Sequence, residues 1–248
     1  MSLEKSEALV IRQADFSETS RVMTFFTREF GKLSMVAKGA RRIRGPFQGA
    51  LDLLATCNIV FIHKSNTSLD LLTEASLVRR FQPAAGAIHS LYGGYYVAEL
   101  LDSLTEEQDP SPPFYEAAQI TLARLSSGQS VLSSIVHFEL IVLQELGQLP
   151  EFDRCVRCEG PLPQRGRVAF KVSQGGFLCA NCEGDSTLIS QHCDSSVPPL
   201  LAELSQQALD SSPLPIDPAR TAEIRRILTA CIAQILGRKP NTARYLPF

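Results

Sequence analysis

Two cysteine pairs constrain the fold of this 248-residue chain more than any other sequence feature. Cys155 and Cys158 form the first C-x2-C pair, and Cys179 and Cys182 form the second after twenty intervening residues. Each pair lets two thiolates from one tight turn reach the same ion, and two pairs complete a tetrahedral zinc site. Because the protein supplies all four ligands, such an ion stabilises the fold and leaves no position for a substrate. We therefore predict one structural zinc ion per chain, held in a ribbon over residues 155–194.

The remaining cysteines have simpler explanations. Cys57 lies in an apolar predicted strand and Cys231 on the apolar face of the last predicted helix, so both are expected to be small buried side chains. His192 and Cys193 are not assigned as ligands, because the two pairs already complete the tetrahedron. The alternative, four unrelated cysteines, is disfavoured since redox pairs seldom occur doubled at this separation.

Short apolar segments separated by turn residues predict a five-stranded structure in the first 80 residues. The expected strands cover residues 8–11, 21–27, 32–38, 58–63 and 68–72. In the third, Leu33, Met35 and Ala37 alternate with polar positions, which places Lys32 and Lys38 on a mostly solvated face. Five short strands in about eighty residues are typical of a small Greek-key barrel of the oligonucleotide-binding type.

Helical periodicity replaces this pattern after residue 83. Helices are expected over a segment that begins at residue 88 and ends near residues 109–110, and over residues 114–125, 131–146, 197–209 and 221–236. The fold class is thus α+β and multidomain: a barrel over 1–80, a helical domain in two parts over 81–154 and 195–248, and the zinc ribbon inserted over 155–194. No segment approaches the roughly 18 consecutive apolar residues that a membrane span needs. With an acidic N-terminus unlike a signal peptide, a cytoplasmic location is expected.

Charge is unevenly distributed along the chain. Residues 1–80 hold 12 Lys and Arg against 8 Asp and Glu, whereas residues 81–154 hold 2 against 10. Lys38, Arg41, Arg42 and Arg44 lie within seven residues, beside glycines that let a backbone approach a ligand closely. An asymmetry of this size suits a polyanion-binding module joined to an acidic scaffold, and it is also compatible with ordinary surface variation.

These features lead to a predicted DNA-contact set in the N-terminal region, with a plain solvated turn as the alternative for the basic loop. Its members are Arg12, Arg21, Lys32, Lys38, Arg41, Arg42 and Arg44. Phe16, Phe30 and Phe47 lie near these cations in the sequence, and aromatic faces beside a cationic groove hold single strands by stacking. Core packing is the alternative for each phenylalanine.

Motifs of the common catalytic classes are absent. The only Gly-Lys dipeptide, at Gly31, lacks the upstream glycine of a phosphate-binding loop, and neither G-x-S-x-G nor H-E-x-x-H occurs. The four histidines are scattered singly. We therefore expect a binding protein rather than an enzyme.

Several segments, taken in order, resemble RecO proteins. Those that carry the resemblance are 8–12, 17–21, 26–32, 37–42, 95–101, 115–116, 138–140, 149–150 and 236–239, together with the cysteine ribbon that many family members have. The resemblance covers essentially the whole chain. One departure is Pro240-Asn241-Thr242, where the family more usually continues with a Leu-Lys-Ser-like sequence.

The resemblance implies an oligonucleotide-binding barrel followed by a helical domain with the zinc element inserted. It also implies a nucleoid-associated recombination mediator that binds single- and double-stranded DNA and anneals complementary strands. With RecR, such proteins help to load the recombinase RecA onto DNA coated by single-strand-binding protein, whose acidic, Phe-ending tail docks in the helical domain. RecF is a further partner that the family suggests. The competing hypothesis is a zinc-stabilised adaptor between proteins, favoured by the acidic 81–154 segment, with only incidental DNA contact.

Overall fold

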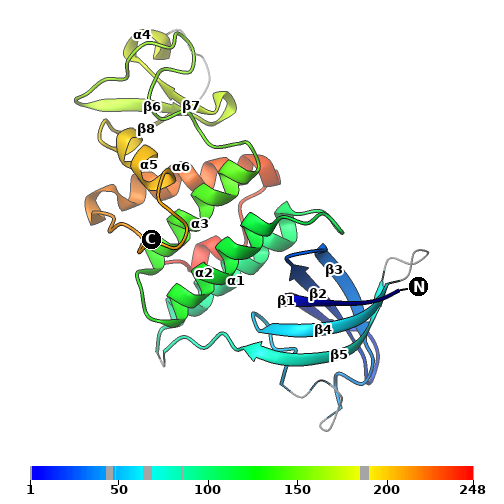
Figure 1. Cartoon of the computed structure of the whole chain (residues 1–248). Helices are drawn as coiled ribbons and strands as arrows, with labels where there is room; N and C mark the ends of the chain where they lie inside the picture. The colour runs from blue at the N-terminus through cyan, green and yellow to red at the C-terminus, as the bar shows by residue number, and fades with distance from the viewer. Residues whose placement is uncertain are drawn as a thin grey trace. The chain divides into compact units, whose positions relative to one another are not determined.

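The computed structural model describes residues 2–42, 47, 49–63, 69–84, 86–184 and 190–247. It comprises two compact units, Met1–Gly128 and Gln129–Phe248 (Figure 1). No helix among the described residues is both long enough and apolar enough to cross a membrane.

Five strands of the first unit form a closed barrel in the order β1-β2-β3-β5-β4. The strands are β1 (Ser2–Asp15), β2 (Arg21–Thr27), β3 (Gly31–Ala37), β4 (Thr56–His63) and β5 (Asp70–Arg79). β3 pairs with β5 in parallel, whereas the other pairs are antiparallel. The expectation of a small five-stranded barrel is confirmed by this closed order.

The first strand is much longer than the sequence predicted. Its residues 2–9 pair with β4 and its residues 8–15 pair with β2, so one coiled strand closes the barrel. Polar residues such as Glu4 and Glu7 interrupt the apolar pattern, which is why only residues 8–11 were expected. β5 likewise continues to Arg79, well beyond the predicted end at residue 72.

The barrel interior is filled by the alternate residues of each strand. Met23, Phe25, Leu33 and Met35 are buried there with Phe61 from β4. The opposite side chains of β2 and β3 point out of the barrel, as the two-residue period of a strand requires. Two helices complete the unit, α1 (Ile88–Leu104) and α2 (Pro112–Ser126).

The second unit combines helices with a small sheet. Its elements are α3 (Val131–Glu145), β6 (Arg167–Lys171), η1 (Val172–Gln174), β7 (Gly176–Leu178), α4 (Ala180–Glu183), β8 (Gln191–Asp194), α5 (Val197–Ser205), α6 (Pro218–Leu236) and η2 (Thr242–Tyr245). The strands form one antiparallel sheet in the order β7-β6-β8. α3 packs against α5 and α6. Asp217 caps α6 by accepting a hydrogen bond from the Ala219 backbone N–H, which the helix itself leaves without a partner.

Gly31, at the start of β3, lies tightly against the backbone of Asp109. Its φ of +67° is left-handed, and a Cβ there would lie 2.1 Å from the carbonyl oxygen of Asp109. We predict that Gly31→Ala destabilises the unit by more than about 2 kcal/mol, since about 1–2 kcal/mol comes from the left-handed backbone alone and the clash is additional. Urea unfolding followed by tyrosine fluorescence reports this unit, because four of the five tyrosines lie in it and the chain has no tryptophan.

Gly86→Ala is the matched control. Gly86 also has a left-handed φ, of +83°, but a Cβ there meets nothing within 4 Å. Gly86→Ala should therefore lower the free energy of unfolding only by the backbone contribution of about 1–2 kcal/mol. Equal unfolding midpoints for the two variants would show that the contact between Gly31 and Asp109 is not tight.

Candidate metal centre and nucleic-acid interface

Local hydrogen bonds shape both cysteine turns. The first turn is closed by the Glu159 backbone N–H, which donates to the Cys155 carbonyl at 2.8 Å, and Glu159 has a left-handed φ of +58°. In the second, the Cys182 backbone N–H donates to the Cys179 carbonyl at 3.0 Å as α4 begins. Each turn therefore brings its two cysteines to one side, which explains why this short spacing predicts a shared site.

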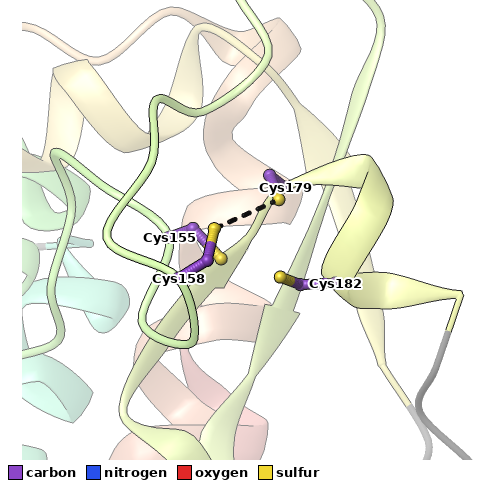
Figure 2. Close-up of side chains that lie close together, drawn as sticks. All are labelled: Cys155, Cys158, Cys179 and Cys182. Carbon is purple, nitrogen blue, oxygen red and sulfur yellow. Dashed lines mark hydrogen bonds between the residues drawn. The ribbon is translucent and has the colours of Figure 1, made fainter.

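The four sulfur atoms converge on one point. All four Sγ atoms lie within 4.8 Å of one another, and those of Cys158 and Cys179 are 3.7 Å apart (Figure 2). A zinc ion with Zn–S bonds of about 2.3 Å places its sulfurs about 3.8 Å apart in a tetrahedron. The geometry and the soft donor set both fit a structural zinc ion. Cys155 is buried, whereas Cys158 is exposed at the surface.

Thiol acidity is uneven within the cluster: burial and hydrogen bonds with the other three sulfur atoms raise the pKa of Cys182 to about 12. Burial raises the pKa of Cys155, but backbone hydrogen bonds from Cys179, Arg157 and Cys158 outweigh it and lower the pKa to about 6. Burial raises the pKa of Cys57, Cys193 and Cys231 to about 12 in each case. These three thiols are distinguished from the cluster by position, because none of them lies among the four converging sulfur atoms.

The structure confirms that Cys57 and Cys231 are buried. Cys193 is buried as well, and its thiol faces the Val168 carbonyl at 3.8 Å. His192 contacts the carboxylate of Glu183. Neither residue belongs to the four-sulfur cluster.

Part of the predicted DNA-contact set gathers at one end of the barrel. Arg21 Nε lies 3.0 Å and Arg41 Nη1 3.6 Å from the carboxylate of Asp15. Arg41 also donates to the Ser17 carbonyl at 2.9 Å, and its backbone N–H donates to the Thr19 carbonyl at 3.1 Å. These bonds tie the turn after β3 to the loop between β1 and β2. Two guanidinium groups thus share one carboxylate, while the exposed Glu18 of the same loop supplies a second negative charge.

The other members lie in different surroundings. Lys38 and Arg42 are exposed on the turn that follows β3. Arg12 is exposed on β1 and lies 3.6 Å from the carboxylate of Asp102. Arg44 lies outside the described residues.

Lys32 requires a correction. Its side chain is not on a solvated face: the residue is 9% exposed, and Nζ donates to the backbone carbonyls of Asp102 at 2.7 Å and Thr105 at 2.5 Å. Strand alternation correctly predicts that the Lys32 side chain faces out of the barrel, but the end of α1 covers that position. Lys32 therefore holds the end of α1, and its ammonium group is not available to bind phosphate.

The three phenylalanines differ clearly in their exposure to solvent. Phe16, in the loop between β1 and β2, is 61% exposed beside the cations at Asp15. Phe47 is buried in the barrel core, and Phe30 packs edge-on against Phe61 with ring centroids 5.6 Å apart. Only Phe16 of the three thus presents its ring to solvent, while core packing accounts for the other two.

The second unit contains a basic groove that sequence reasoning did not locate. It has a volume of about 650 Å³. Its lining comes from β8, one face of α6 and the segment after α6: Gln191, Ala222, Arg225, Arg226, Thr229, Ala230, Lys239, Pro240, Asn241, Ala243 and Arg244. The spacing 222, 225, 226, 229 and 230 is that of a single helix face, a signal that the sequence does carry.

Charge in this groove is partly compensated. Arg225 is buried and forms an ion pair with the buried carboxylate of Glu139. Arg226, Lys239 and Arg244 are exposed. Arg226 Nη2 donates to the His192 carbonyl at 2.7 Å. The exposed cations therefore line a groove that also offers apolar surface from alanine and proline side chains.

Comparison with known proteins matches the chain along its length. The family model described as "Recombination protein O N terminal" matches residues 1–81, and "Recombination protein O C terminal" matches residues 85–244. A relative from Rhodopirellula baltica, named DNA repair protein RecO, is 31% identical over 97% of this chain and 97% of its own length. Proteins with the same name from Anaeromyxobacter dehalogenans (strain 2CP-1) and Salinibacter ruber are 30% and 36% identical, over 99% and 73% of this chain and 96% and 68% of their own lengths.

Proposed function

Because this chain belongs to the RecO family of DNA repair proteins, we propose that it is a non-catalytic recombination mediator that binds single- and double-stranded DNA. The observation that carries the proposal is the cluster of Arg21, Arg41 and the exposed Phe16 at one end of a closed five-stranded barrel. Loops and the β2–β3 face are where barrels of the oligonucleotide-binding type hold a strand. Guanidinium groups bind phosphate, and an aromatic face stacks on a base.

This arrangement also suits strand annealing. Phosphate contacts position a strand without reading its sequence, and base edges that the protein leaves free can pair with a complementary strand. We propose that Arg12, Arg21, Lys38, Arg41 and Arg42 supply the phosphate contacts and that Phe16 supplies the stacking contact. Loading of RecA with RecR, and contact with RecF, belong to the same proposal and are supported by family membership.

We propose that the cluster of Cys155, Cys158, Cys179 and Cys182 holds one structural zinc ion. A bound zinc would offset half of the negative charge of four thiolates and fix the two turns against β6 and β7. The support is the convergence of four sulfur atoms at a tetrahedral spacing. Cys155 also packs with Ala169 and Leu178, so the metal site and the small apolar core of the ribbon share residues.

We further propose that the basic groove of the second unit receives the acidic, Phe-ending tail of single-strand-binding protein. Arg226, Lys239 and Arg244 would meet its carboxylates, while the apolar lining would receive the terminal aromatic ring. Pro240 and Asn241, two of the three residues at which this chain departs from the usual family sequence, lie in that lining. The details of tail recognition would then be particular to this chain.

DNA binding is tested by polarisation of a labelled oligo-dT over a salt series. We predict that Arg41→Glu/Arg42→Glu weakens binding and flattens the salt dependence, because each lost phosphate contact removes roughly 0.7 from the slope of log affinity against log salt. In the same series, Phe16→Ala should lower affinity by about 1–3 kcal/mol and leave the slope unchanged, because stacking releases no counterions.

The alternative, an adaptor between proteins, makes the opposite prediction. Weak binding of oligo-dT by the wild type even at low salt would favour the adaptor. A wild-type slope in the double variant would instead mean that the turn after β3 does not hold the strand.

Metal content tests the zinc site. We expect about one equivalent of zinc in freshly purified protein, and we expect Cys155→Ser to lose it together with the fold of β6–β8, since metal binding is coupled to folding in such sites. Cys193→Ala, in the same sheet, should retain the zinc. Elemental analysis gives the content, and limited proteolysis reports the fold. Less than half an equivalent in the wild type would contradict the proposal.

Peptide binding tests the groove. A labelled peptide of several aspartates ending in phenylalanine should bind the wild type, and Lys239→Glu should weaken it about tenfold or more, because a charge-assisted hydrogen bond contributes about 1.5–3 kcal/mol. Arg238→Glu is the matched control: it makes the same charge change one residue away, outside the groove lining. Equal losses in both variants would indicate only a general charge effect.

A further inference from the structure

The outward face of β2 and β3 is covered at one end and open at the other. Three cross-strand pairs point out of the barrel: Val22 with Val36, Thr24 with Ser34, and Phe26 with Lys32. Phe26 is fully buried and Lys32 nearly so, whereas Val22 and Val36 are half-buried. Exposure thus increases toward the end of the barrel that carries Arg21 and Arg41.

The segment 105–110, which joins α1 to α2, covers part of this face at the Phe26–Lys32 end. The Gln108 backbone N–H donates to the Lys32 carbonyl at 2.9 Å, and Glu107 forms a parallel bridge with Lys32. Ser34 Oγ donates to the Glu107 carboxylate at 2.8 Å. The segment therefore lies against β3 through its own backbone, in the manner of a short added strand.

Two further features fix this position. Gly31 leaves room for the Asp109 carbonyl, where any Cβ would clash. Gln108 adopts a left-handed φ of +60°, which costs energy in a residue with a side chain and persists only where the surroundings hold it. The segment is thus a built part of the barrel surface.

The segment is also strongly acidic. Glu106, Glu107 and Asp109 are all exposed. A nucleic-acid strand that continued along β3 from the open end would bring its phosphates against these carboxylates. Like charges within a Debye length of about 8–10 Å repel even in physiological salt.

We propose that the segment 105–110 is a barrier that ends the path of single-stranded DNA on this barrel. The strand binds only at the Val22–Val36 end, and its footprint is short for a barrel of this kind. This inference rests on the proposed DNA binding and adds to it the residues that limit how much of the face the strand can use.

The test is the dependence of affinity on strand length. Wild-type affinity for oligo-dT should stop rising near the lower end of the roughly 4–16 nucleotides that such barrels cover. Glu106→Lys and Asp109→Lys should each extend that length and steepen the salt slope by roughly 0.7, because a cation in place of the carboxylate gains a phosphate contact. Both side chains are exposed, so the substitutions leave the packing of Gly31 and Ser34 intact.

Glu74→Lys is the charge-matched control. Glu74 is exposed on β5 and pairs with Val60 of β4, beyond the three residues of β5 that pair with β3. It should leave both the limiting length and the slope at wild-type values. If Glu106→Lys and Asp109→Lys match Glu74→Lys, the barrier is refuted while DNA binding stands. Absence of salt-sensitive oligo-dT binding in the wild type would instead refute the proposed function itself.

Discussion

The first unit depends on one buried ammonium group. Lys32 lies at the start of β3 with its Nζ on the Asp102 and Thr105 carbonyls, at the C-terminal end of α1. The last carbonyls of a helix have no partner within it and carry partial negative charge. A buried cation is costly unless it is bonded, so each group satisfies the other. The end of α1 is thereby fixed on the barrel, and the acidic segment that follows must run along β3.

The same contact shows where sequence reasoning stops. Alternation along residues 32–38 correctly separates the barrel interior from its outward face, because a strand has a period of two whatever surrounds it. It cannot show that another element covers that outward face, and so Lys32 was wrongly placed in solvent. For the same reason the sequence could not show which of the three phenylalanines is exposed. The exposure of Phe16 and the burial of Phe47 depend on contacts between distant segments.

The cysteine cluster could be predicted because ligand chemistry acts locally. Two residues between cysteines form one turn, and four thiols suit one soft ion, so the spacing alone identified the set that the structure brings together. The basic groove had no comparable local signature, since its lining comes from three separate segments. Its helix face has the spacing 222, 225, 226, 229 and 230, but that period is equally typical of a face packed in a core.

The distribution of charged residues matters more for this protein than its net charge. The overall charge of -2 hides a cationic barrel end and an acidic segment in the same unit. Asp15 has a related role on a smaller scale, because its carboxylate orients Arg21 and Arg41 without cancelling both charges. The proposed mediator role requires DNA to be held and then released, and phosphate contacts from a few exposed cations are reversible and sensitive to salt. The proposed DNA site on the barrel and the basic groove share no residues, so the proposed protein tail need not compete with DNA for the same side chains.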